Sequence, residues 1–162
     1  MEKRIQSFDP IVDDQSEILI LGSIPGNKSL EMQQYYAHPQ NQFWKIIFYV
    51  LKGNFSSDYY ERVAFLKLKH IALWDVIDTC ERKGSLDTAI RNEEANDIAQ
   101  LLKNHPNIKA IFCNGQKSFN NMKKILNNST IPVYSLPSTS PAHTISFDVK
   151  LKAWEIIQDF LD

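Results

Sequence analysis

A polar segment that follows an apolar run holds the residues best suited to chemistry. Residues 18–21 are all aliphatic, and the segment GSIPG at 22–26 then combines two glycines with a proline. Glycine permits a positive φ angle and a close approach of backbone to ligand, whereas proline fixes its own φ and donates no N–H. Asn41 follows, after YYAHPQ and before Phe43 and Trp44. Its amide oxygen could orient a water molecule, so we expect Asn41 to do more than cap a helix.

Other polar residues end or follow later apolar runs. Asp75 lies in the run IALWDVI, Asn114 begins an Asn-Gly turn after residues 110–113, and PSTSPAH at 137–143 follows a further run. An ionised Asp75 can only accept hydrogen bonds, whereas serine hydroxyls and backbone amides can donate to phosphate oxygens. Ligands of open α/β sheets bind at the carboxyl ends of the strands, so these segments are candidates for a binding site.

Two common site types do not fit this chain. GSIPGNKS is superficially like a phosphate-binding P-loop, but three residues separate its glycines and Asn27 precedes Lys28. A P-loop needs four residues between the glycines and a lysine directly after the second one. His38 and His143 have no carboxylate at a fixed spacing, so a loop-stabilising hydrogen bond suits each at least as well as catalysis. With no CxxC or histidine-rich cluster, we expect neither a metal nor a cofactor.

Strands and helices are predicted to alternate along the chain. Aliphatic runs predict buried parallel strands at 18–21, 71–77, 110–113 and 132–136. Helices are predicted at 41–52, 58–67, 93–104 and 149–161, with another that ends near 126, and residues 1–15 as an arm packed across the domain. Such alternation implies parallel pairing through right-handed crossovers. We therefore predict one α/β domain over residues 1–162, a three-layer α/β/α sandwich with a four-stranded parallel sheet.

Composition limits the compartment and the partners. The chain has 162 residues, of which 43% are apolar, which suffices for one domain without metal or disulfides. Two cysteines, no secretory signal and no apolar span of about 18 residues predict a cytoplasmic protein without a membrane segment. The net charge is −1, but residues 98–147 contain five lysines and no Asp or Glu. This distribution predicts an electropositive half, although solvated helix faces would give the same pattern.

Four segments together resemble the uracil-DNA glycosylase superfamily. They are GSIPG with YYAHPQNQFWK, then LWDV at 73–76, FCNG at 112–115 and LPSTSPAH at 136–143. Within it the chain most resembles the hypoxanthine (deoxyinosine) DNA glycosylase branch, with the mismatch-specific uracil glycosylases as close relatives. The resemblance covers nearly the whole chain. It implies the uracil-DNA glycosylase-like fold, with DNA as the partner, and we expect a monomer.

Three positions depart from the patterns of this superfamily. Ile24 stands where uracil-cleaving branches commonly carry Asp, Asn or Glu to position the attacking water. Leu136 stands where a His or Asn often contacts uracil. Both departures fit the deoxyinosine branch, which is held to use the asparagine that matches Asn41. His143 departs from that branch as well, because its second motif usually ends in Asn.

The resemblance implies a role for each candidate residue. Asn41 and Asp75 are expected to be catalytic, and Asp75 stands where relatives place a base-reading asparagine. Tyr36 stands where relatives place the aromatic residue that stacks on a flipped base. The other base-binding candidates are Ile24, Pro25, Gly26 and Asn114. The DNA-binding candidates are Ser23, Ser138, Thr139, Ser140, Pro141, His143 and Lys117.

The implied activity is that of a DNA repair glycosylase that flips a deaminated or mismatched base out of DNA and hydrolyses its N-glycosidic bond, with hypoxanthine favoured and uracil as an alternative. Asn41 cannot deprotonate water well, so we expect slower turnover than in carboxylate-using relatives. We also expect a monofunctional enzyme, without lyase activity. The competing interpretation is a binding module of the same fold, which holds DNA or a nucleobase after losing catalysis through Ile24 and Leu136.

Overall fold

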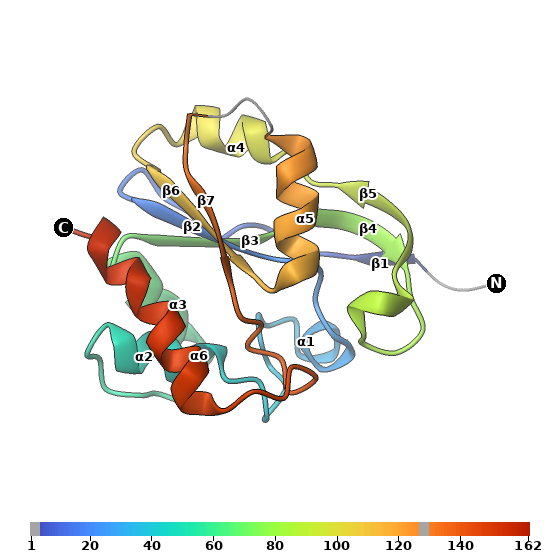
Figure 1. The fold of residues 1–162 in the computed structure, drawn as a ribbon, viewed down its shortest axis with the longest axis horizontal. Helices are drawn as coiled ribbons and strands as arrows, with labels where there is room; N and C mark the ends of the chain where they lie inside the picture. Colours follow the sequence, from blue (N-terminus) through green and yellow to red (C-terminus); the bar gives the residue numbers. More distant parts are fainter. Residues whose placement is uncertain (1–3, 127–129) are drawn as a thin grey trace.

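A four-stranded parallel sheet forms the centre of the computed structural model, which describes residues 4–126 and 130–162. Its strands lie in the order β3-β2-β6-β7, and every neighbouring pair is parallel. The predicted four-stranded parallel sheet is therefore confirmed (Figure 1). The strands are β2 (Ile18–Gly22), β3 (Ile71–Asp75), β6 (Ala110–Asn114) and β7 (Val133–Leu136).

Helices cover both faces of this sheet, which gives the three predicted layers (Figure 1). The α-helices are α1 (Asn27–Met32), α2 (Phe43–Val50), α3 (Tyr59–Leu68), α4 (Ile98–Asn104), α5 (Gln116–Ile125) and α6 (Phe147–Trp154), and the 3-10 helices are η1 (Asp87–Ala89) and η2 (Glu155–Phe160). None of the helices described is long and apolar enough to cross a membrane.

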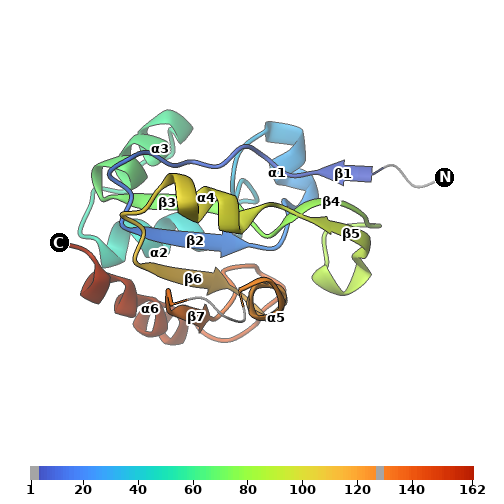
Figure 2. The same ribbon diagram turned by 90° about the horizontal axis from the view of Figure 1, so that it is seen from above.

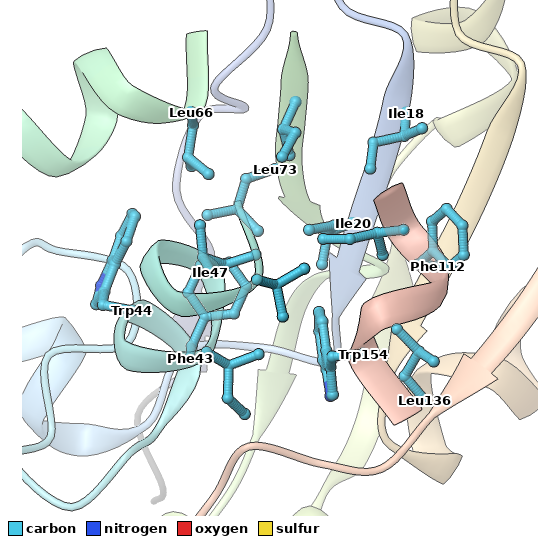
Figure 3. Packing of buried hydrophobic residues seen from close by; sticks show 14 of the residues in the cluster. Ile18, Ile20, Phe43, Trp44, Ile47, Leu66, Leu73, Phe112, Leu136 and Trp154 are labelled. Atoms are coloured by element: carbon cyan, nitrogen blue, oxygen red, sulfur yellow. The ribbon is translucent and has the colours of Figure 1, made fainter. Parts of the chain in front are cut away.

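The two faces of the sheet bury separate apolar clusters because side chains alternate along each strand. Ile18 and Ile20 of β2 face α2 and α6, where Phe43 meets Trp154 edge to face (Figure 3). Leu19 and Leu21 belong to the cluster on the opposite face, beneath α4 and α5. Each such side chain, when fully buried, contributes about 1.5–3 kcal/mol to folding. The strand that leads into the candidate site is thus held from both sides.

A second, antiparallel sheet was not predicted. It joins β1 (Arg4–Gln6), β4 (Ile77–Glu81) and β5 (Arg91–Ala95) in the order β1-β4-β5. It lies at the end of the molecule opposite the C-terminus (Figure 2). Only residue 76 separates β3 from β4. The main sheet therefore continues almost directly into the small one, next to the candidate site.

This sheet corrects one predicted element and adds a strand to another. The prediction of a helix over 93–104 is wrong in its first part, because residues up to Ala95 pair with β4 and the helix begins only after Asp97. The Asp97 carboxylate accepts from the Gln100 N–H and caps that helix. The arm at 1–15, whose first three residues lie outside the described part, contains β1 and not only irregular chain. The arm also contacts the main sheet, since Ile11 forms an antiparallel bridge with Leu73.

Two further element boundaries differ from the prediction. The long polar segment after β2 contains the short helix α1. The closing helix begins at Phe147, ends as an α-helix at Trp154 and continues as η2. Helix ends are commonly tightened into 3-10 turns, and the apolar side chains of the predicted helix still recur about every three to four residues. Neither difference moves a candidate site residue to another edge of the sheet.

Candidate functional site

The candidate segments meet at one edge of the parallel sheet. β2 ends at Gly22, β3 at Asp75, β6 at Asn114 and β7 at Leu136. Gly22 lies opposite Asp75 in the β2–β3 register, and Asn114 lies opposite Leu136 in the β6–β7 register. The loops after these strands therefore emerge side by side, as expected for a ligand site in an open α/β sheet.

Gly22 is the point at which two polar side chains converge. A Cβ atom at Gly22 would lie 2.5 Å from Oδ1 of Asp75 and 2.8 Å from the hydroxyl of Tyr36. Asp75 is only 4% exposed. Within the described residues, neither its Oδ2 atom nor the Tyr36 hydroxyl makes a well-formed hydrogen bond, although the Asn114 amide lies near the hydroxyl. Buried polar atoms without partners are uncommon, so this pair is a strong indication of a ligand site.

Burial changes the protonation of both groups. It raises the pKa of the Asp75 carboxyl to about 7, and the negative charge of Asp87 adds to the effect. Burial and the neighbouring Asp75 also raise the pKa of the Tyr36 phenol well above its ordinary value, while the Asn114 amide acts in the opposite direction. Near neutral pH, therefore, Asp75 exists in both forms and Tyr36 is protonated.

Tyr36 is held in place by its ring and its backbone. The ring stacks on Phe43 of α2, with centroids 4.1 Å apart and an interplanar angle of 23°. Its φ of 54° lies in the left-handed region, which is uncommon for a bulky residue and recurs at functional sites. The next residue is fixed by a hydrogen bond from the Ala37 N–H to the Ser29 hydroxyl. One face of the aromatic ring predicted to stack on a base is thus already occupied.

A prediction follows from the tight contact at Gly22. Gly22→Ala is expected to destabilise the protein by about 1–3 kcal/mol, because Asp75 and Tyr36 must both move away from the added methyl group. Thermal or urea unfolding measures the change. Gly26→Ala is the matched control, since a Cβ there meets Ser85 only at ordinary contact distances of 3.5 Å or more. Equal stabilities for the two variants would contradict the prediction.

Asn41 lies at the entrance to α2. Its Oδ1 atom accepts a hydrogen bond of 3.0 Å from the Phe43 N–H, while its own N–H donates to the His38 carbonyl. The N-cap residue itself is Gln42, which makes no side-chain capping bond. Within the described residues the Asn41 amide group donates no hydrogen bond. The side chain is therefore oriented by the helix start and is partly exposed.

Asn114 and Thr139 bind each other reciprocally. The Asn114 amide donates to the Thr139 hydroxyl at 3.0 Å, and its oxygen accepts from the Thr139 N–H at 2.9 Å. The Thr139 carbonyl in turn accepts from the Gln42 N–H at the start of α2. These bonds join the ends of β6 and β7 to the segment that holds Asn41. Asn114, which sequence reasoning placed among the base-binding residues, fixes the architecture of the site here.

The segment 137–143 is held from below by α6. The Trp154 indole donates to the Pro137 carbonyl, and the ammonium of Lys150, only 1% exposed, donates to the Ser140 carbonyl. The hydroxyls of Ser138 and Ser140 accept from the backbone N–H groups of Ser140 and Ala142. Pro141 and His143 are exposed at the tip. Among the residues that the structure describes, neither serine hydroxyl donates a hydrogen bond, which suits contacts with phosphate oxygens.

The segment 23–27 is clamped by the connection between β4 and β5. The Ser23 hydroxyl donates to Asp87 at 2.7 Å, and the Asn27 N–H donates to the Ser85 hydroxyl at 2.9 Å. Arg82, which is buried, donates to the Pro25 carbonyl at 2.9 Å. Sequence reasoning missed Arg82, and no local pattern marks it, because its role depends on the unpredicted second sheet.

Ile24 and Pro25 are buried rather than presented at the surface. The Ile24 side chain is 7% exposed and belongs to the apolar cluster with Leu21 and Val76. Its departure from the polar residue of related branches is therefore accommodated by packing. Gly26 remains partly exposed as the N-cap of α1. This segment therefore presents mainly backbone groups to a ligand.

Lys117, at the start of α5, does not stand in an acid-free environment. Its ammonium forms an ion pair with Glu93 of β5, and Glu93 also accepts from Asn121. The positive charge of residues 98–147 is thus partly neutralised by Glu93, which lies outside that segment. In the described part of the chain, no group of three or more His, Cys, Asp or Glu side chains is placed to hold a metal ion.

Comparison with known proteins gives the family. A family model described as the uracil DNA glycosylase superfamily matches residues 10–158. The chain belongs to this superfamily. Its relatives in the uracil DNA glycosylase superfamily include two proteins named hypoxanthine DNA glycosylase. The one from Methanosarcina barkeri is 37% identical over 150 residues, which cover 92% of this chain and 94% of the relative. The one from Methanosarcina acetivorans is 34% identical over 153 residues, covering 94% and 96%.

The fold agrees with that of a solved member. A solution NMR structure of a Methanosarcina acetivorans protein, provisionally assigned as a uracil DNA glycosylase, superposes with a TM-score of 0.86 at 33% identity. The match covers 96% of both chains. The resemblance seen in the four sequence segments is therefore confirmed at the level of the superfamily and the fold.

Proposed function

We propose that this DNA glycosylase removes hypoxanthine from DNA by hydrolysing its N-glycosidic bond. The observation that carries the proposal is the buried, unpartnered pair formed by Asp75 and Tyr36 at the edge of the sheet. Two relatives that align over nearly the whole chain are named for this activity, which supports the choice of base. The edge of a flipped base carries hydrogen-bond donors and acceptors, which could serve as the missing partners of these two side chains.

Cleavage of the glycosidic bond builds positive charge on the sugar and negative charge on the departing base. A strong nucleophile is not required for such a reaction, but a positioned water is. Asn41 is the residue to which we assign the water, because its side chain is oriented by the Phe43 N–H and its amide group remains free within the described residues. Water adds to the sugar carbon, the bond to the base breaks, and the base leaves with the electron pair and one proton.

The enzyme is proposed to be monofunctional. A lyase step requires an amine that attacks the sugar carbon, and the lysines within or next to the motifs are Lys28 and Lys45. The Lys28 ammonium lies 3.6 Å from the Glu31 carboxylate on α1 and is thus engaged in a local ion pair, while Lys45 is exposed on α2. Borohydride trapping with an inosine duplex would reveal a covalent adduct if an amine took part, and we expect none.

The experiment that tests the function uses labelled duplexes containing inosine, uracil, a thymine mismatch or only normal pairs. Incubation followed by alkaline cleavage should give strand breaks with inosine, and weaker or no breaks with the others. Duplex binding measured in parallel separates the competing interpretation. Binding to the inosine duplex without any strand breaks would show a binding module and overturn the proposed activity.

Binding to DNA is expected to depend only weakly on salt. With a net charge of −1, only about three to five phosphates should be neutralised. The slope of log K against log salt concentration should therefore be about −3 to −4. Titrations of an inosine duplex at several salt concentrations measure it.

A pair of double variants locates the DNA in the same titration. Lys117→Ala/Lys123→Ala on α5 should make the slope shallower. Lys67→Ala/Lys69→Ala should not, because these lysines precede β3 and lie toward the opposite edge of the sheet. A slope steeper than about −7, or one that only the second pair alters, would place the DNA on another face.

A further inference from the structure

We propose that Asp75 works as a neutral carboxylic acid that donates a hydrogen bond to the carbonyl oxygen of the departing base, with the Tyr36 hydroxyl beside it. The proposal rests on the proposed function, since it assigns a chemical role within that same site. It differs from the role expected from sequence, in which an ionised Asp75 only accepts from the base. A neutral carboxyl both donates and accepts, as the side-chain amide of an asparagine does.

The geometry brings the two groups to a single point. Both approach the position where Gly22 lacks a side chain, and both polar atoms are buried without a partner among the described residues. The Asp75 backbone is fixed as well, because its carbonyl accepts from the Asn96 side chain at 2.8 Å. The Asp75 carboxyl is itself buried, which separates it from solvent as a partner. A bound base is the natural partner for these atoms.

The surroundings favour the uncharged form of the acid. Among the described residues, the ionisable groups that interact with Asp75 are the phenols of Tyr35 and Tyr36 from the segment before α2 and the Asp87 carboxylate of η1, while the neutral Asn114 amide at the end of β6 acts on Tyr36. Burial and the like charge of Asp87 both disfavour ionisation, and they hold the pKa near 7. A carboxyl kept neutral by its site is a strong hydrogen-bond donor toward an oxygen that becomes negative.

The chemistry of hypoxanthine fits such a donor. As the bond between sugar and base breaks, the electron pair moves onto the ring and part of the charge reaches the carbonyl oxygen. A hydrogen bond from Asp75 to that oxygen strengthens during this step, whereas an ionised carboxylate would repel it. The attacking water keeps one proton as the new sugar hydroxyl, and its other proton neutralises the base. Asp75 itself ends the reaction unchanged.

The test is the pH dependence of single-turnover excision from an inosine duplex between pH 5.5 and 8.5. The wild-type rate should fall about 30-fold from pH 6 to pH 8.5 if only the neutral form is active and its pKa is 7. Asp75→Asn, which offers a donor and an acceptor at every pH, should stay within about tenfold of the wild-type rate at pH 6 and show no fall. Asp75→Ala should be about 100-fold slower at pH 6.

Asp87→Asn gives a matched control outside the proposed contacts with the base. It leaves the burial of Asp75 in place but removes the like charge that raises the Asp75 pKa further, so the falling limb should move to lower pH while the rate at pH 5.5 stays nearly the same. A wild-type rate that rises with pH, an inactive but folded Asp75→Asn, or an Asp75→Asn profile that falls like the wild type would each overturn the proposal. A wild-type protein with no inosine excision at any pH would instead overturn the proposed function.

Discussion

Asn41→Ala should reduce the single-turnover rate of hypoxanthine excision by about 1,000-fold. The proposed water contact is the reason, because Ile24, at the position where related branches carry a polar residue, is buried in the core. Folding should change little, since the loss is one hydrogen bond at the start of α2, about 1 kcal/mol. Duplex binding should also be kept, because the phosphate contacts are assigned to other segments. Quenched single-turnover assays with excess enzyme measure the rate directly.

Two companion variants sharpen this experiment. Gln40→Ala changes an exposed neighbour in the same loop and should leave the rate within about twofold of the wild type. Asn41→Asp keeps an acceptor for the Phe43 N–H and adds a charge that can attract a proton from water, so it should retain far more activity than Asn41→Ala. If Asn41→Ala excised hypoxanthine at nearly the wild-type rate, the water would have to be held elsewhere, and Asp75 would be the next candidate.

Asp75→Asn should stabilise the protein by about 4 kcal/mol at pH 8 and by almost nothing at pH 4. The folded state raises the pKa of Asp75 from 3.8 to about 7, so it binds this proton more tightly than the unfolded chain does. Wild-type stability is therefore lost as pH rises from about 4 to 7, and the loss stays constant above that range. The asparagine variant carries no ionisable group at this position and escapes the loss.

Urea unfolding of both proteins at several pH values checks this result. The difference in unfolding free energy should grow between pH 4 and pH 7 and then level off. Asp78→Asn is the matched control, because it removes a partly exposed carboxylate from the neighbouring strand β4. A difference for Asp75→Asn that does not vary with pH would mean that the carboxyl is ionised in the folded state at little cost. The proposed role of a neutral Asp75 in catalysis would then lose its physical basis.

Stability and activity of Asp75→Asn should be compared in the same protein. Burying an acid at this position makes the protein less stable at neutral pH than an amide would, and such a loss of stability is common at functional sites. We therefore expect Asp75→Asn to be the rare site variant that gains stability at pH 8 and retains measurable excision. Such a combination would separate a chemical role for Asp75 from a merely structural one.

The amino-acid sequence by itself determined the parallel sheet and indicated the edge at which the candidate site lies. Four apolar runs have the length and composition of buried strands, and each is followed by a polar segment with glycine, proline or asparagine. These are local properties, readable from neighbouring residues. They also carried the family resemblance, which the match over residues 10–158 confirmed. Since parallel strands end at one edge, Asp75, Asn114 and the loop that contains Asn41 could be assigned to one candidate site before their geometry was known.

Only the tertiary structure decided what the individual side chains do. Residues 93–95 were predicted as the beginning of a helix, yet they belong to β5, which pairs with β4. The Asn114 side chain forms hydrogen bonds with Thr139, and the Lys117 ammonium forms an ion pair with Glu93 of β5. The protonation of Asp75 depends on burial and on Asp87, which is twelve residues away in the chain. The hydrogen-bond partners, burial and electrostatic environment of a side chain are set by residues distant in sequence. Periodicity and composition therefore assign these side chains to an edge of the sheet but do not determine their charge or their contacts.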